Sequence, residues 1–137
     1  MSMVRKAIDA LNRAPKKWFL VDGIGAAFSA LLAGAVLVHF EEFLGMSSSA
    51  LFKLALAACL IVIYDIHHFL RKDLSPSLLR QRLRVLASTN AAYVLLSLAF
   101  AYNHRVTLTA AGWGYILLEG VVVMSLAVME YKSAERA

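Results

Sequence analysis

The sequence predicts an all-α membrane protein: an up-down bundle of four transmembrane helices, preceded by a short amphipathic helix. Three observations predict this fold. Hydrophobic residues make up 61% of the 137 positions, above the roughly 45–50% that is usual in soluble domains. Four apolar runs are each long enough for a helix to cross a hydrocarbon core about 30 Å thick. Basic residues gather on one side of these runs. We expect residues 1–137 to form a single transmembrane domain.

The four expected spans cover approximately residues 18–40, 50–70, 83–102 and 108–131. Short links separate them, and short links favour antiparallel neighbours. Ser48 or Ser49 is expected to cap the second span, because serine at this position accepts a backbone hydrogen bond. Ser75 followed by Pro76 is a typical helix start, so the third helix should begin before it enters lipid.

Residues 2–14 predict a short amphipathic helix on the inner leaflet of the membrane. Its apolar residues recur at helical spacing: Met3, Val4, Ala7, Ile8 and Leu11. Ser2 is placed to cap this helix and Pro15 to end it. A disordered basic tail is the alternative.

The distribution of basic residues predicts the orientation. They occupy the N-terminal segment and the second link, at Arg5, Lys6, Arg13, Lys16, Lys17, Arg71, Lys72, Arg80, Arg82 and Arg84. The first link has none, and the third has only Arg105. The positive-inside rule therefore places both termini in the cytoplasm, and we expect a bacterial inner membrane. No basic soluble module that would bind nucleic acid is visible.

Glu119 lies near the middle of the fourth expected span. A carboxyl group is costly in lipid, so this one should be protonated or paired with a hydrogen-bond donor. Its possible functions are proton carrier, cation site or counter-ion of a substrate. A purely structural role, as a hydrogen bond between helices, is the alternative.

A polar layer is expected in the cytoplasmic half, where Asp22, Asp65 and Asn90 lie at similar depth. An ionised Asp22 is within reach of Arg84, Lys17 or Asn90. Asp65 is spaced to pair along its own helix with His68 or Arg71. A structural layer near the membrane interface is the alternative to a functional one.

Several polar residues fall on helix faces that point toward one interior. The candidate substrate- or proton-binding residues are Glu119, Asp22, Asn90, Tyr93, Ser29 and Tyr115. They predict a small polar-lined interior that runs from Asp22 to His104. Small residues at a spacing of four, such as Gly25 and Ser29, equally favour close helix packing with no cavity.

Metal and cofactor signals are weak. The weak metal candidates at the outer mouth are His39, His104, Glu41 and Glu42, whose ligand types suit a divalent ion. Solvated interfacial side chains are the alternative, and His67 and His68 are expected to face headgroups. No zinc-protease, P-loop, nucleophile-elbow or dinucleotide motif is present. An enzyme of standard mechanism is therefore disfavoured, and no cofactor is expected.

The size and four-span plan resemble those of the small multidrug resistance transporters, which use one membrane-embedded glutamate. In that family the glutamate lies in the first span, whereas here Glu119 lies in the fourth. The resemblance therefore covers architecture alone, and no residue is carried over.

The leading functional prediction is a proton- or cation-linked small-molecule binding or transport protein centred on Glu119. Its expected partners are the lipid bilayer and, because four spans make a thin bundle, a second copy of the chain. The alternative is a structural or accessory membrane subunit, or an effector whose partner protein supplies the activity, with Glu119 joining helices.

Overall fold

The computed structural model describes residues 2–136 and confirms the all-α four-helix bundle, with no strand among these residues. Four continuous helical stretches, Lys17–Leu44, Ser48–Leu70, Pro76–Asn103 and Ala110–Arg136, are long and apolar enough to cross a membrane. The elements are α1 (Met3–Arg13), α2 (Lys17–Leu31), a π-helical turn η1 (Leu32–Val36), a 3-10 turn η2 (Leu37–Phe40), α3 (Glu41–Leu44), α4 (Ser48–Leu70), α5 (Pro76–Asn103) and α6 (Ala110–Arg136).

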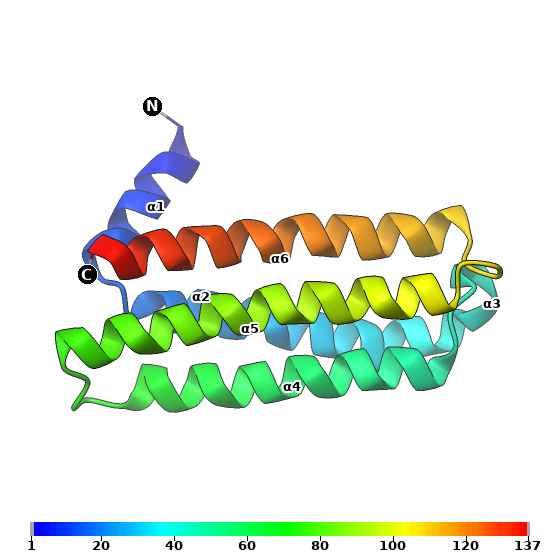
Figure 1. The fold of residues 1–137 in the computed structure, drawn as a ribbon, viewed down its shortest axis with the longest axis horizontal. Helices are drawn as coiled ribbons and strands as arrows, with labels where there is room; N and C mark the ends of the chain where they lie inside the picture. Colours follow the sequence, from blue (N-terminus) through cyan, green and yellow to red (C-terminus); the bar gives the residue numbers. More distant parts are fainter. Residues whose placement is uncertain (1, 137) are drawn as a thin grey trace.

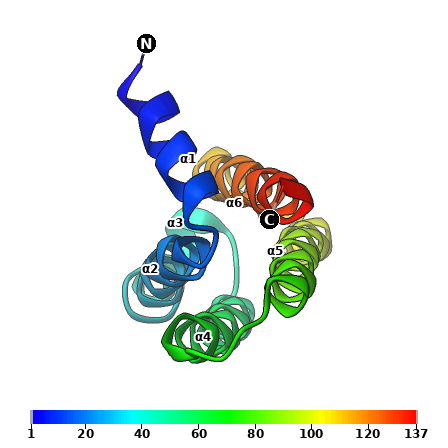
Figure 2. The ribbon, with the colours of Figure 1, turned by 90° about the vertical axis from the view of Figure 1, so that its left-hand side faces the viewer.

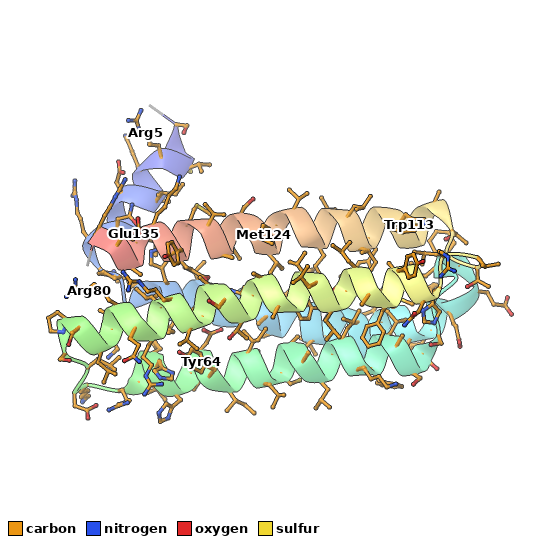
Figure 3. The ribbon with its side chains drawn as sticks, in the orientation of Figure 1. Arg5, Tyr64, Arg80, Trp113, Met124 and Glu135 are labelled. Atoms are coloured by element: carbon orange, nitrogen blue, oxygen red, sulfur yellow. The ribbon has the colours of Figure 1, made fainter. Side chains whose placement is uncertain are left out.

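Successive long helices run antiparallel (Figure 1). Both termini and the link 71–75 lie at one end of the bundle, here called the terminal end. The links 45–47 and 104–109 lie at the other end, here called the distal end. Viewed along the bundle, α2, α4, α5 and α6 surround a common axis (Figure 2). Side chains of Arg5, Arg80 and Glu135 lie at the terminal end, and that of Trp113 lies at the distal end (Figure 3).

The four long helices form two hairpins. Helix α2 packs along α4, and α5 packs along α6. Contacts between α4 and α5 are fewer, and the seam between α2 and α6 is the loosest of the four. This unequal packing leaves room between the hairpins.

The N-terminal helix begins and ends as predicted. The Ser2 Oγ accepts a hydrogen bond from the Arg5 backbone N at 3.3 Å, and the helix ends at Arg13, two residues before Pro15. Helix α1 buries none of its residues fully and leans away from the bundle (Figure 1).

The first long helix departs from α geometry at its distal half, where η1 and η2 occur. Close approach to α4 occurs in η1. A Cβ added to Gly34 would lie 3.0 Å from the Ala55 Cβ. A larger side chain at Gly34 would therefore push the two helices apart.

Serine residues cap both internal helix starts. At α5 the prediction is confirmed: the Ser75 Oγ accepts from the Leu78 N at 3.3 Å, and Pro76 is the first helical residue. At α4 the prediction of Ser48 or Ser49 is wrong, because both are already helical. Ser47 has the extended backbone that a cap requires, and its Oγ accepts from the Ala50 N at 3.2 Å.

At the terminal end, the exposed link between α4 and α5 carries an ion pair. The Arg71 Nε lies 2.9 Å from the Asp73 Oδ1. The hydrogen bonds from this guanidinium hold the pKa of the Asp73 carboxyl below its usual range.

At the distal end, three hydrogen bonds join the link 104–109 to the end of α3 and to Gly45; we call this set the distal clasp. The Thr107 Oγ1 donates to the Gly45 carbonyl at 2.9 Å, and the Thr109 Oγ1 donates to the Phe43 carbonyl at 2.6 Å. The Thr109 backbone N donates to the Leu44 carbonyl at 3.1 Å. These bonds tie the α2–α4 hairpin to the α5–α6 hairpin.

We predict that Gly45→Ala destabilises the bundle by at least about 1 kcal/mol, because Gly45 has a left-handed backbone with φ 73°. An added Cβ would also lie 1.9 Å from the Thr107 carbonyl oxygen. Thermal unfolding in detergent measures the effect. The matched control is Gly114→Ala, whose Cβ meets nothing within 4 Å. Equal melting temperatures for the two variants would contradict the prediction.

Candidate functional site

A cavity of about 250 Å³ lies between the four long helices. All six residues predicted from the sequence as the binding set line it: Asp22, Ser29, Asn90, Tyr93, Tyr115 and Glu119. Most of the remaining lining is apolar. A Cβ added to Gly25, which also lines the cavity, meets no atom within 4 Å. Close packing without a cavity is therefore wrong for this part of the bundle.

Glu119 is held by two tyrosines. The Tyr93 hydroxyl, on α5, donates to Oε1 at 2.8 Å, and the Tyr115 hydroxyl, one turn earlier on α6, donates to Oε2 at 3.0 Å. The sequence predicted that Glu119 is either protonated or paired with a hydrogen-bond donor, and the structure shows the pairing with donors. Hydrogen bonds to a carboxylate are stronger than bonds between neutral groups. They fix the Glu119 side chain against the cavity wall.

The cavity reaches the outer surface at the seam between α2 and α6. Phe28 on α2 and Leu118 and Val122 on α6 all line it. These three side chains are also 66%, 69% and 52% exposed. A group that lines a cavity and is exposed marks its mouth. The mouth is apolar and lies on the side of the bundle.

A second cluster of polar side chains lies toward the terminal end, with Asn90 at its centre. The Asn90 Nδ2 donates to the Asp22 Oδ1 at 2.7 Å and lies 3.1 Å from the Glu130 Oε2. The three residues come from α2, α5 and α6, and each is at most 3% exposed. We call these residues the Asn90 network. Of the three partners expected for Asp22, the structure shows Asn90, and Asp22 forms no ion pair with Arg84 or Lys17.

Asp65, on α4, completes this region. It is 1% exposed, and neither carboxyl oxygen has a hydrogen-bond donor among the described residues. The side chain of Asp22 lies within hydrogen-bonding reach of it. Gly23 permits this approach, since a Cβ there would lie 3.2 Å from the Asp65 Cβ.

Local pairing of Asp65 with His68 or Arg71 is therefore wrong. The His68 Nδ1 lies 2.8 Å from the Tyr64 carbonyl oxygen, and Arg71 pairs with Asp73. His68 does not face headgroups either, because it is 5% exposed and its ring stacks on Phe19 at 5.4 Å. Packing between α2 and α4 continues to the helix ends and buries it.

Glu130 was missed by sequence reasoning, although it is 0% exposed. It lies at the polar end of the last apolar run, close to Tyr131 and Lys132, where a side chain is usually solvated. One signal could have found it. Glu130 follows Glu119 by 11 residues, three helical turns, so both lie on one face of α6.

The weak metal candidates do not form a site. His39, Glu41 and Glu42 are exposed. His104 lies outside the cavity, where its Nε2 is 3.2 Å from the Ser47 Oγ at the distal end. The predicted interior therefore ends near Glu119 rather than at His104. Within residues 2–136, no three His, Cys, Asp or Glu side chains come together in a way that could hold a metal ion.

Comparison with known proteins adds no relative. The chain matches no family model, no curated protein and no solved structure. The interpretation of the cavity therefore depends on its own geometry.

We predict that Asn90→Leu lowers the free energy of unfolding by about 1–3 kcal/mol, because it leaves the Asp22 and Glu130 carboxyl groups without the amide donor. Denaturant unfolding in detergent measures this loss. Thr89→Val is the matched control on the same helix, since the Thr89 hydroxyl is exposed and bonds only its own helix backbone. A loss for Asn90→Leu no larger than that of the control would contradict the prediction.

Proposed function

We propose that this chain is a small integral membrane protein that binds a small organic cation in its cavity, as part of proton- or cation-linked binding or transport. The observation that carries the proposal is Glu119 on the cavity wall with both oxygens bonded to tyrosine hydroxyls. Binding sites for small molecules are typically apolar cavities with a few convergent polar groups, and this cavity has that composition.

The charge of the site favours a cationic ligand. Within residues 2–136, Glu119 makes no ion pair with a basic side chain. An organic cation would supply the missing positive charge. The rings of Tyr93 and Tyr115 would add cation–π attraction, and the surrounding apolar residues would contact its hydrocarbon part.

The side opening between α2 and α6 favours a ligand that partitions into lipid. Its rim is apolar, at Phe28, Leu118 and Val122. A ligand with a hydrocarbon body can therefore enter from the bilayer without crossing the distal clasp. Full passage to the distal side would require that clasp to open or a second copy to complete a pathway, so we include a homodimer in the proposal for transport.

We further propose that the terminal end faces the cytoplasm of a bacterial cell. The basic side chains support this orientation, because all except Lys53 and Arg105 belong to segments at the terminal end. Helix α1 would then lie on the inner leaflet, with exposed residues such as Met3 and Val4 in contact with lipid.

A structural role for Glu119 is the second candidate, and one contact favours it. The Tyr93–Glu119 hydrogen bond connects α5 with α6, the two helices of one hairpin. On this alternative, the chain is an accessory subunit. Glu119→Gln would then preserve function, while Glu119→Leu would reduce stability.

The binding proposal predicts that Glu119→Gln weakens binding of benzyltrimethylammonium by about tenfold or more, because the variant loses a charge-assisted interaction. Isothermal titration of detergent-purified protein measures the affinity. Neopentylbenzene, the uncharged analogue of the same shape, should show no such difference between wild type and variant. Ser125→Ala is the control variant, since Ser125 is exposed and bonds only its own helix. Equal affinity of wild type and Glu119→Gln for the cation would reject the proposal.

The orientation predicts opposite labelling of two exposed positions. In a Cys59→Ala background, Glu42→Cys at the distal end should react with a membrane-impermeant maleimide in intact bacterial cells. Asp73→Cys at the terminal end should react only after the cells are broken. The reverse pattern would show that the chain is inserted the other way.

A further inference from the structure

We propose that Asp22, Asp65 and Glu130 form a proton-binding site in which Asp22 is the carboxylate and Asp65 and Glu130 are neutral acids. The site is separate from Glu119 and lies toward the terminal end of the bundle. Its three carboxyl groups come from α2, α4 and α6, and none is more than 3% exposed.

Within residues 2–136, no basic side chain forms an ion pair with these carboxyl groups. Among residues 2–136, the one ion pair is Arg71 with Asp73, on the exposed link. Of the neighbouring titratable and charged groups, Arg82 has a buried Nε with no hydrogen-bond partner among the described residues, and it forms no ion pair with the three carboxyl groups. The others make hydrogen bonds elsewhere. The Tyr64 hydroxyl donates to the Arg82 carbonyl, the His68 Nδ1 lies at the Tyr64 carbonyl, and the Lys16 ammonium donates to the Arg71 carbonyl.

The contacts between the carboxyl groups require protons. The Asp22 side chain lies within hydrogen-bonding reach of both Asp65 and Glu130. Two ionised carboxylates have no donor between them, so each contact is a hydrogen bond only when one partner carries a proton. These protons would supply hydrogen bonds to atoms that have no other partner among the described residues, namely the oxygens of Asp65 and the Oδ2 of Asp22. One proton for each contact gives two protons for three carboxyl groups.

Asn90 identifies which group stays ionised. Its amide donates to the Asp22 Oδ1 at 2.7 Å, the shortest bond of the Asn90 network. Asp22 is also the one carboxyl group that contacts both others. As a carboxylate it would accept from the Asn90 amide and from the acids Asp65 and Glu130. Several donors can stabilise one buried carboxylate in this way.

The site also touches the cavity, because Asp22 and Asn90 line it. A cation bound there would favour further ionisation next to Asp22, so that a proton leaves Asp65 or Glu130 for water as the cation enters. This coupling rests on the proposed function, whereas the proton-binding site itself does not.

Infrared spectroscopy of the ligand-free protein in liposomes tests the site. At neutral pH the wild type should show carbonyl bands of protonated carboxyl groups. Asp65→Asn and Glu130→Gln should each remove one component, whereas Asp73→Asn, an exposed control, should remove none. The Glu119→Gln variant identifies any infrared band that comes from Glu119.

Isotope labelling keeps this test independent of how the variants fold. Labelling the aspartate carboxyl groups of the wild-type protein should shift the Asp65 component and leave the Glu130 component in place. Protonated bands that neither labelling nor the two variants alter, or the absence of such bands, would overturn the proposal.

A weakly buffered solution with a pH indicator tests the coupling. Addition of benzyltrimethylammonium should release roughly one proton for each cation bound, as linkage between the two sites requires. Asp65→Asn should bind the cation with reduced release. Binding without release would reject the coupling alone. Absence of binding, with the infrared bands present, would reject the proposed function and leave the proton-binding site intact.

Discussion

The hydrogen bond between Asn90 and Asp22 is the interaction on which the arrangement of the bundle most depends. Asp22 and Asp65 belong to the α2–α4 hairpin, whereas Asn90 and Glu130 belong to the α5–α6 hairpin. The 2.7 Å bond from the Asn90 amide to Asp22 therefore joins the hairpins where apolar packing alone is weak. Lipid offers no replacement partner, so the two hairpins must stay together at this point for these groups to remain satisfied.

The same bond explains why the cavity lies where it does. The hairpins meet at the Asn90 network and at the distal clasp, and the cavity lies between these two places. Glu119 stands within this gap. Its carboxyl group is satisfied inside the α5–α6 hairpin, by Tyr93 and Tyr115. It therefore places a carboxyl group on the cavity wall without closing the cavity.

The sequence predicted the number and order of the helices well, because span length and link composition depend on local chemistry. It also predicted the six polar residues among those that line the cavity, since a polar side chain in lipid must turn inward. It failed for Glu130 and His68. His68 was expected to face headgroups because of its place at the end of an apolar run, and no prediction was made for Glu130. In the structure, α6 extends beyond the predicted span to Arg136, and this longer helix contributes to burial at the terminal end. Such burial depends on neighbouring helices, which one run of sequence does not describe.

The distal clasp has a mechanical consequence. The bonds of the clasp involve hydroxyl and backbone groups with no titrating member, so neither pH nor salt weakens the clasp directly. In the proton-binding site proposed above, the contacts toward the opposite end depend on how many protons the carboxyl groups share. The two hairpins are therefore joined by fixed hydrogen bonds at the distal end and by proton-dependent contacts toward the terminal end. A change in the number of these protons would alter the contact between the hairpins at that end, and the width of the opening between α2 and α6 would change with it.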